Sequence, residues 1–126
     1  MSQTFTHTVF IVDDDEDDRG SIRDAFNESK YLLDYVFMQN GEELMKYFSK
    51  ANGKNHPSLV LLDLNMPGMN GRDVLKEMKK NELLKPIPVI VVTTSSSPAD
   101  KEMSYRLGAN CFITKPNSFK EFIKID

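Results

Sequence analysis

The sequence predicts an α/β fold in which a parallel five-stranded sheet carries helices on both of its faces. Short runs of mainly apolar residues recur five times, at residues 9–12, 33–38, 59–62, 89–92 and 110–114. Segments whose apolar residues have helical spacing separate these runs. Continuous apolar strands are typical of sheets buried on both faces, and strand–helix alternation favours right-handed crossovers within one sheet. We therefore expect a three-layer sandwich.

Length and composition indicate one domain, residues 1–126, with a core of its own. The chain is 40% hydrophobic and 28% charged, as ordinary globular proteins are. Its start does not resemble a secretory signal, and no apolar run approaches the roughly 18 residues of a membrane span. The single cysteine, Cys111, cannot form an internal disulfide, and its place in a predicted strand favours a small core residue over a nucleophile. These features predict a cytoplasmic protein without membrane contact.

Negative charge is concentrated at one place in the chain. The net charge is −3, and the run Asp13-Asp14-Asp15-Glu16-Asp17-Asp18 alone holds six acidic residues. The 16 Lys and Arg residues are scattered, without a basic cluster of the kind that follows a phosphate backbone. We therefore expect no direct binding of nucleic acid.

The first strand ends in an acid, whereas the second strand has the pattern of a sheet edge. The run 9–12 is followed by Asp13 and then by a helix, predicted from the spacing of Ile22, Ala25 and Phe26. Glu16, Asp17 and Asp18 fall in the first turn of that helix, where the helix dipole favours acids. The run 33–38 alternates imperfectly, which predicts an edge strand with one exposed side.

Capping signals mark the second and third helices. Asn40 and Glu43 resemble a capping box, and the helix they begin has the apolar positions Leu44, Phe48 and Ala51. Gly53 and Pro57 follow its end. After the run 59–62 comes Asp63, then a Pro67-Gly68 turn, and Asn70 caps a helix that carries Val74, Leu75 and Met78. The lysines on the solvated side of this helix are Lys76, Lys79 and Lys80.

The last third of the chain completes the strand–helix alternation. The run 89–92 leads into the polar residues 93–97, and Ser97-Pro98 begins a helix that ends at Gly108. The apolar stripe of this helix is thin, so we expect it to be the least firmly anchored; it consists of Ala99, Met103 and Leu107. The strand 110–114 precedes Lys115-Pro116 and a short helix at 118–125, whose inward residues are Phe119, Phe122 and Ile123.

Polar residues follow four of the five strands. Because the carboxyl ends of parallel strands share one edge of the sheet, we expect one crevice that contains Asp13, Asp14, Asp63, Thr93 and Lys115. Asp63 on its own has two interpretations, since an aspartate often just starts a turn. Its convergence with the other strand ends favours a functional role.

The chemistry of this crevice points to a metal ion and a phosphoryl group. Three converging carboxylates repel one another unless a divalent cation joins them, and carboxylates with a carbonyl and waters suit Mg²⁺. A calcium loop read from Asp15 fails, because it places Arg19 and Phe26 at ligand positions. A metal, an ammonium and a hydroxyl suit a phosphoryl group, and aspartate is a known phosphoryl acceptor. We interpret Asp63 as that acceptor.

These residues resemble the receiver domain of two-component response regulators, in particular the single-domain, chemotaxis-regulator-like members. The resemblance runs from Val12-Asp13-Asp14 through residues 63–71 and Val92-Thr93 to Lys115-Pro116. Each motif alone is weak, but their order and their places at strand ends are specific. The resemblance implies a flavodoxin-like (βα)5 fold with strand order 2-1-3-4-5.

The resemblance also implies a role for each site residue. Mg²⁺ would be held by Asp13, Asp14, Asp63 and the backbone carbonyl of Asn65, and Asp63 would be phosphorylated. Phosphoryl contacts would come from Thr93, Thr94 and Lys115, with the bulk of Thr94 narrowing access. Phe112 and Thr93 would form the switch, although Phe112 also suits a core position. The Lys115–Pro116 bond is a candidate cis peptide.

The implied function is signalling rather than catalysis on a separate substrate. A sensor histidine kinase or a histidine phosphotransfer protein would donate the phosphoryl group, and the face formed by residues 98–107, 110–114 and 118–125 would respond, with phosphorylation-dependent dimerisation as one outcome. Two alternatives remain: a receiver-like binding module that works without phosphorylation, and a phosphatase of the haloacid dehalogenase type. Asp13-Asp14-Asp15 matches the start of the phosphatase motif, but Asp17 departs from it. No output domain is visible in the sequence.

Overall fold

A computed structural model describes residues 7–27, 33–51 and 54–115 of the chain. The strands are β1 His7–Val12, β2 Leu33–Met38, β3 Leu59–Leu62, β4 Val89–Thr93 and β5 Cys111–Thr114. Every neighbouring pair is parallel, and the order across the sheet is β2-β1-β3-β4-β5. This confirms the predicted α/β fold and its strand order.

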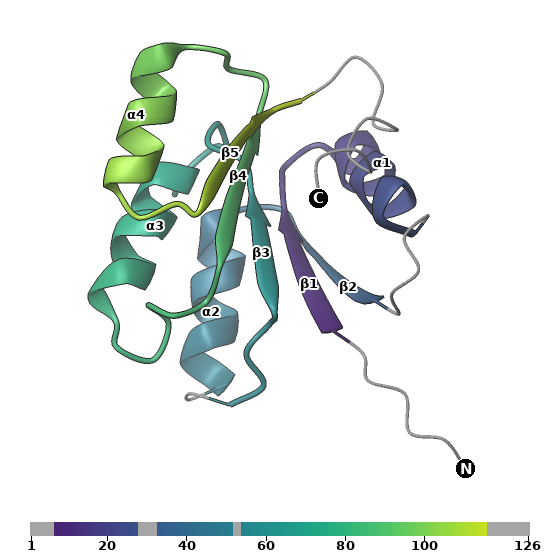
Figure 1. Ribbon diagram of the computed structural model, residues 1–126. Helices are drawn as coiled ribbons and strands as arrows, with labels where there is room; N and C mark the ends of the chain where they lie inside the picture. Colours follow the sequence, from purple (N-terminus) through teal and green to yellow (C-terminus); the bar gives the residue numbers. More distant parts are fainter. Residues whose placement is uncertain (1–6, 28–32, 52–53, 116–126) are drawn as a thin grey trace.

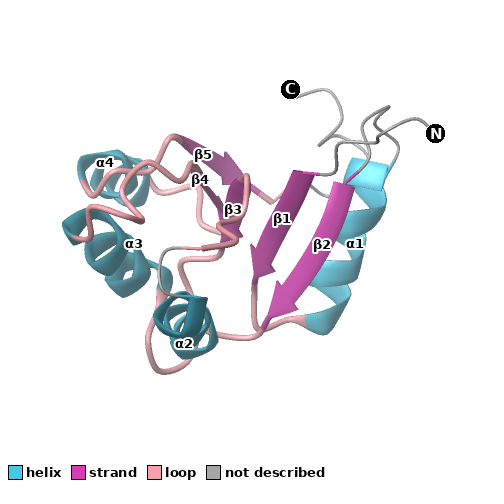
Figure 2. Cartoon of the chain, turned by 90° about the horizontal axis from the view of Figure 1, so that it is seen from below, coloured by secondary structure: helices cyan, strands magenta, loops and turns pink. Residues whose placement is uncertain are grey.

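Helices cover both faces of this sheet. They are α1 Glu16–Asn27, α2 Gly41–Ala51, α3 Gly71–Lys80 and α4 Pro98–Arg106. Helix α1 lies on one face, whereas α2, α3 and α4 lie side by side on the other (Figures 1 and 2). Within the described ranges, none of the helices has the length and apolar character needed to cross a membrane. The helix expected at 118–125 and the Lys115–Pro116 peptide bond lie outside the described residues.

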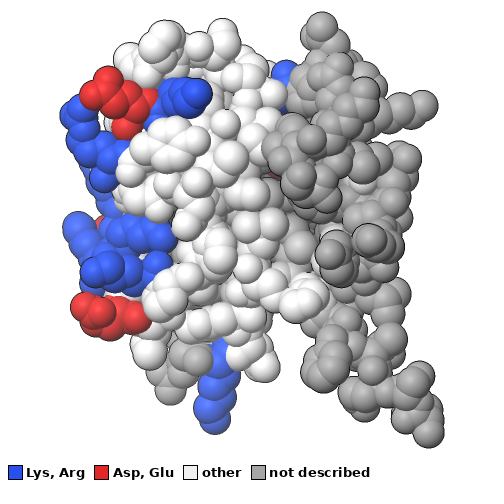
Figure 3. Space-filling view, in the orientation of Figure 1, with Lys and Arg blue, Asp and Glu red and all other residues white. Residues whose placement is uncertain are grey.

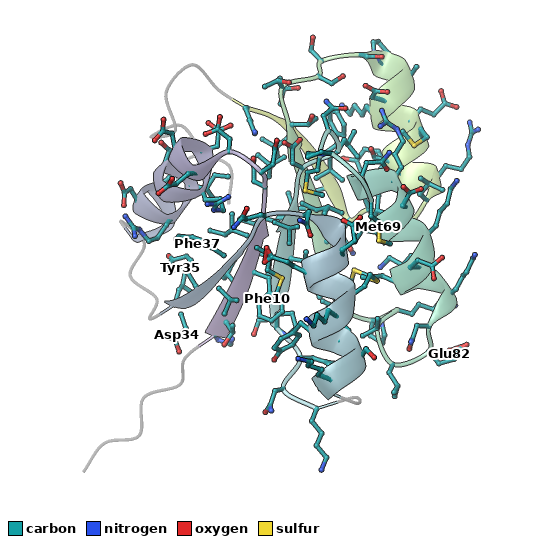
Figure 4. The ribbon with its side chains drawn as sticks, turned by 180° about the vertical axis from the view of Figure 1, so that it is seen from behind. Phe10, Asp34, Tyr35, Phe37, Met69 and Glu82 are labelled. Carbon is teal, nitrogen blue, oxygen red and sulfur yellow. The ribbon has the colours of Figure 1, made fainter. Side chains whose placement is uncertain are left out.

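The sheet separates two apolar clusters. The larger one fills the space under α2, α3 and α4 and includes Phe10, whose side chain points toward α2 (Figure 4) and whose ring meets that of Tyr47 edge-on at 4.9 Å. The smaller one joins Ile22 and Ala25 of α1 to the opposite face of the sheet. The predicted inner faces of α1, α2 and α3 are thus confirmed at their buried residues, which are Ile22, Ala25, Leu44, Phe48, Val74, Leu75 and Met78.

Strand β2 lies at one edge of the sheet, as its imperfect alternation predicts. Its side chains are mostly exposed or half-buried, and the large apolar side chains of Val36 and Phe37 are both exposed. The Arg23 guanidinium of α1 lies 5.9 Å from the centre of the Phe37 ring and covers part of it. Tyr35 and Phe37 lie together on this side of the sheet (Figure 4).

The predicted caps form, with one change of partner. Asn40 Oδ1 accepts a hydrogen bond from the Glu43 N–H at 2.9 Å, but the Glu43 carboxylate accepts from the Gln39 N–H and not from that of Asn40. Asn70 forms the complete capping box with Asp73 at the start of α3. Only the first half of the box predicted at Asn40 is therefore present.

Helix α4 departs from its predicted apolar stripe. Ala99 is exposed, Met103 and Leu107 are half-buried, and the one residue of the helix classed as buried is Ser104. The stripe was wrong at Ala99 because polar contacts, rather than apolar packing, hold the start of this helix. Asp100 accepts hydrogen bonds from Arg72 Nη2 of α3 at 3.1 Å and from Ser95 Oγ at 2.7 Å.

The solvated side of α3 is also narrower than predicted. Lys79 is half-buried, and its Nζ donates to the carbonyl of Lys85 at 3.1 Å. Its methylene groups lie against Gly108, where an added Cβ would come within 2.7 Å of Lys79 Cγ. The Lys79 stem thus fills the space at the end of α4 that a side chain on Gly108 would need.

Charged side chains gather over α3 and α4 on the face shown in Figure 3. Basic and acidic residues alternate there, and two exposed ion pairs join Lys80 to Glu77 at 3.6 Å and Arg106 to Glu102 at 2.6 Å. Such a mixed surface lacks the single-sign field that attracts a phosphate backbone. The absence of direct nucleic-acid binding stays a prediction.

Helix α3 packs tightly against the end of β3, and a glycine makes this possible. A Cβ built on Gly71 would lie 2.3 Å from the Asp63 carbonyl oxygen and 2.8 Å from Leu64 Cα. Gly20, in the interior of α1, has open space around it. The two glycines thus have opposite structural roles, and the one at residue 71 fixes the chain that carries Asp63.

We predict opposite effects of alanine at these two positions. Gly71→Ala forces α3 away from β3 and should lower the free energy of unfolding by about 1–3 kcal/mol, as overpacking does. Gly20→Ala should raise it by about 0.5–1 kcal/mol, because glycine is a poor helix residue. Urea denaturation of both variants measures this. Equal effects of the two substitutions would contradict the packing described for Gly71.

We also predict that Asp100→Asn destabilises the protein in a pH-dependent way. The Ser95 hydroxyl and Arg72 hold the pKa of Asp100 below its usual value of 3.8. The stabilisation by the carboxylate is therefore complete above that value and is lost as the pH falls through the lower pKa of the folded state.

Urea denaturation over a series of pH values should give a lower free energy of unfolding for Asp100→Asn than for the wild type at neutral pH. This difference should disappear in acid. Glu102→Gln, which removes an exposed ion pair, serves as the control and should change little. A gap that stays constant with pH would show that the Asp100 charge does not anchor α4.

Candidate functional site

Four strands deliver the predicted side chains to one edge of the sheet. The backbone ladder continues one residue past the strands, because the Asp63 N–H donates to Val12 O at 3.0 Å and the Lys115 N–H donates to Thr93 O at 2.7 Å. The Asp13 N–H likewise donates to Met38 O at 3.0 Å, so hydrogen bonds of their own backbones fix Asp13, Asp63 and Lys115. The structure thus brings Asp13, Asp63, Thr93 and Lys115 to the same end of the sheet, and their functional roles stay predictions.

Three carboxylates converge in this crevice. Asp13, Asp14 and Asp63 each offer an oxygen, and these oxygens all lie within 4.8 Å of one another. Asp13 and Asp63 are buried, whereas Asp14 is exposed. The buried Asp13 Oδ2 has the Lys115 ammonium as its charged partner, 2.8 Å away. A hard divalent cation suits this donor set, because it would join three carboxylates whose combined negative charge one ammonium does not neutralise.

Lys115 places its ammonium among the carboxylates. Its Nζ lies 2.8 Å from Asp13 Oδ2, 2.7 Å from Asp18 Oδ2 and 3.4 Å from Asp63 Oδ2, with only 8% of the side chain exposed. Burial lowers the pKa of Lys115, but its contacts with Asp13, Asp18 and Asp63 outweigh this effect and raise the pKa above its usual value. The side chain is therefore a fixed positive charge at neutral pH.

The two buried carboxyl groups are held in an environment that disfavours their charge. Burial is the main cause that raises the pKa of Asp13 and of Asp63 above 3.8, and the nearby Lys115 ammonium partly opposes it. For Asp63, the N–H of Asn65 and the hydroxyl of Thr93 act in the same direction as Lys115. Additional positive charge in the crevice would therefore be bound favourably.

Thr93 and Asn65 meet beside the acceptor carboxylate. The Thr93 hydroxyl is fully buried and accepts from Asn65 Nδ2 and from the Ser95 N–H, both at 3.4 Å. The Asn65 N–H donates to Asp63 Oδ1 at 3.2 Å. The sequence pointed to the carbonyl of Asn65, so the contact of its side chain with Thr93 is new. Thr94 is exposed beside this group.

Phe112 lies away from the carboxylates, on the other side of Thr93 along the sheet. It is half-buried, packs against the larger apolar cluster, and pairs with Val91 in the register of β4 and β5. Its N–H donates to the hydroxyl of Tyr105 in α4 at 3.2 Å. This position agrees with its interpretation as a core residue and leaves the switch role as a prediction.

Asp18 is the site residue that sequence analysis missed. It was assigned to the dipole of α1, and it does lie in the first turn, where Asp15 Oδ1 accepts from its N–H at 3.0 Å. Its carboxylate, however, pairs with Lys115. The available signal was the short distance along the chain from the end of β1 to this helical turn, which keeps Asp18 at the same edge of the sheet.

The turn after Asp63 is held from α2. Gly68 has a positive φ of 71°, a conformation that glycine adopts at little cost. The Met69 N–H donates to Glu42 Oε2 at 3.0 Å. Together with the close packing of Gly71, these contacts hold the segment that carries Asp63 and Asn65 at both of its ends.

Comparisons with known proteins identify the family. A family model described as the response regulator receiver domain matches residues 9–125. Response regulator Rcp1 of Synechocystis is 33% identical over 120 residues, which cover 93% of this chain and 82% of Rcp1. Among solved structures, that of the phosphorylated cyanobacterial phytochrome response regulator RcpA superimposes with a TM-score of 0.86 at 35% identity, covering 96% of this chain and 89% of RcpA.

A second solved structure, the Mn²⁺-bound form of Rcp1, superimposes with a TM-score of 0.83 at 33% identity and covers 94% of this chain and 88% of Rcp1. The family model spans nearly the whole chain, and the relatives agree with it in fold as well as in sequence. The chain therefore belongs to the family of response regulator receiver domains.

Proposed function

We propose that this chain is a phosphoacceptor of a two-component system or phosphorelay. A sensor histidine kinase or a histidine phosphotransfer protein would be the donor, so the P–N bond of a phosphohistidine breaks while a P–O bond to the Asp63 carboxylate forms. The observation that carries this proposal is the contact of the buried Asp63 carboxylate with the Lys115 ammonium, 3.4 Å away, beside two further acids. One of the similar proteins, RcpA, has a structure described as phosphorylated.

Mg²⁺ is the cation that we assign to the three carboxylates. Asp13, Asp14, Asp63 and the backbone carbonyl of Asn65 would hold it, and it would neutralise charge on the phosphoryl oxygens during transfer. The convergence of three carboxylates, two of them buried, around one ammonium supports this assignment. So does the Mn²⁺-bound structure of the similar Rcp1, since Mn²⁺ and Mg²⁺ both prefer oxygen ligands.

Different side chains of this site would contact different parts of the phosphoryl group. The ammonium of Lys115 approaches one oxygen, and the hydroxyl of Thr93 gives up its present contacts and donates to another. Thr94 stands at the entrance, contacts the group and narrows access to it. Charge-assisted hydrogen bonds of this kind contribute about 1.5–3 kcal/mol each, enough to shift two states that differ by a few kcal/mol.

We propose that this shift reaches the face formed by α4 and β5. When the Thr93 hydroxyl turns toward the phosphoryl group, it releases the Ser95 N–H, which begins the loop that α4 is anchored to. Phe112 then moves toward the vacated space, and the altered face binds a downstream protein or a second copy of the chain. Because Asp63 is the acceptor, the chain needs no separate substrate, and we place it in the cytoplasm with its donor.

Replacement of the acceptor tests this proposal directly. Asp63→Asn should keep the fold but take no phosphoryl group, because the amide is not a nucleophile. The variant and the wild type are incubated with Mg²⁺ and a small phosphodonor, and the intact mass is measured. Asp24→Asn, which loses an exposed ion pair, is the control and should be labelled like the wild type.

A phosphoryl group on the Asp63→Asn variant would contradict the assignment of Asp63 as the acceptor. If the wild type also stays unlabelled, and if binding to a captured partner is unchanged by Asp63→Ala, the chain works as a phosphorylation-independent binding module. Continuous turnover of a phosphate ester would instead indicate the phosphatase.

Metal binding should stabilise the fold. At an Mg²⁺ concentration one hundred times the dissociation constant, we expect the free energy of unfolding to rise by about 2.7 kcal/mol, and EDTA should reverse the rise. In Asp13→Asn the gain should shrink strongly, because one of the two buried carboxylates of the metal site is lost. Thermal unfolding with and without Mg²⁺ measures this, with Asp34→Asn as an exposed control. An undiminished gain in Asp13→Asn would place the metal elsewhere.

A further inference from the structure

Lys115 has a third acidic partner that comes from a helix and not from a strand end. The Asp18 carboxylate of α1 lies 2.7 Å from Lys115 Nζ, whereas Asp63, the proposed acceptor, is 3.4 Å away. An ammonium has three N–H donors, so each carboxylate around Lys115 takes part of its capacity. In this state the ammonium is closer to the α1 side of the crevice than to the acceptor.

The acidic partners of Lys115 differ in whether a metal ion can take the place of its ammonium. Asp13 and Asp63 belong to the set of acids whose oxygens converge on a metal position, and Asp18 does not belong to that set. A cation would thus compensate Asp13 and Asp63 while leaving Asp18 paired with Lys115. The Asp18 side chain is 27% exposed, against 2% for Asp13, so water can hydrate its carboxylate when the ammonium moves away.

We propose that Asp18 is a positioning residue that restrains the Lys115 ammonium on the α1 side and competes with the phosphoryl group for it. This inference rests on the proposed function, since it concerns the same phosphoryl-binding step. The unphosphorylated state keeps Lys115 on Asp18; binding of the phosphoryl group requires the ammonium to shift toward Asp63 and Asp18 to become hydrated.

The proposal predicts that the loss of Asp18 lowers the stability of the unliganded protein but raises its affinity for a phosphoryl group. Without Asp18, the unliganded protein loses an ion pair and becomes less stable. The phosphoryl-bound state loses nothing that it uses, so affinity for a phosphoryl group rises. A purely structural role, in which Asp18 only ties α1 to the end of β5, would lower both quantities, because the Lys115 side chain would be less well placed in either state.

Beryllofluoride, a mimic of a phosphoryl group, supplies the test. Calorimetric titration in excess Mg²⁺ compares the wild type with Asp18→Asn, which has the same shape without the charge. We expect roughly two- to fivefold tighter binding by the variant, the range of a partly exposed ion pair, and a lower melting temperature without ligand. Asp18→Glu keeps the charge and should return the affinity toward that of the wild type.

A neighbouring acid provides the matched control. Asp17 lies in the same helical turn, is exposed, and has no contact with Lys115 in the described part of the chain, so Asp17→Asn removes an equal charge without freeing the ammonium. Its affinity for beryllofluoride should equal that of the wild type. An equal gain in Asp17→Asn would overturn the proposal, because net charge alone would then explain it.

The outcomes separate this inference from the function on which it rests. Unchanged or weaker binding by Asp18→Asn, with normal binding by the wild type, overturns the role of Asp18 and leaves the phosphoacceptor function standing. If the wild type, Asp18→Asn and Asp17→Asn all fail to bind beryllofluoride in the presence of Mg²⁺, the phosphoacceptor function itself is overturned. If Asp18→Asn does not fold, Asp18→Ser removes the same charge and is judged by the same comparison.

Discussion

The single ammonium of Lys115 lies among three carboxylates at the carboxyl edge of the sheet, and the arrangement of the site depends on this excess of negative charge. Asp13 and Asp63 are buried, so their charge is costly unless positive charge lies beside them. One ammonium cannot compensate three acids and the exposed Asp14 as well. The crevice is therefore suited to a cation. With the cation bound, it is suited to a dianionic phosphoryl group, which the cation and Lys115 would hold together.

The rest of the fold holds this charge cluster in place from several directions. The parallel direction of the strands brings the carboxyl ends of β1, β3 and β5 to the same end of the sheet. Because Gly71 has no side chain, α3 can pack closely against the end of β3. The loop after β4 has a different basis, because hydrogen bonds among Ser95, Asp100 and Arg72 hold it rather than buried apolar side chains. Segments held mainly by polar contacts at the surface open more easily than apolar cores. This difference makes the loop suited to respond when Thr93 changes its partner.

Much of the fold and the outline of the site could be predicted from the sequence, because apolar runs that end in polar residues carry both signals at once. The strands, the caps at Asn70 and Ser97, and the convergence of Asp13, Asp63 and Lys115 follow from periodicity and from the geometry of parallel sheets. What could not be predicted depends on the direction of individual side chains. Asp18 was assigned to the helix dipole although its carboxylate reaches Lys115, and Ala99 was assigned to the core although Asp100 and Ser104 make the contacts of α4. Helical spacing gives the face of a helix, but not which polar group will meet a partner from another strand.

The measurement that tests the central claim most directly is a crystal structure of the protein with Mg²⁺ and beryllofluoride. The account predicts beryllium on a carboxylate oxygen of Asp63, fluorides within hydrogen-bond distance of Lys115 Nζ and the Thr93 hydroxyl, and Mg²⁺ on Asp13 and Asp14. Beryllium on another residue, or a metal that leaves the Asp13 carboxylate unligated, would contradict it.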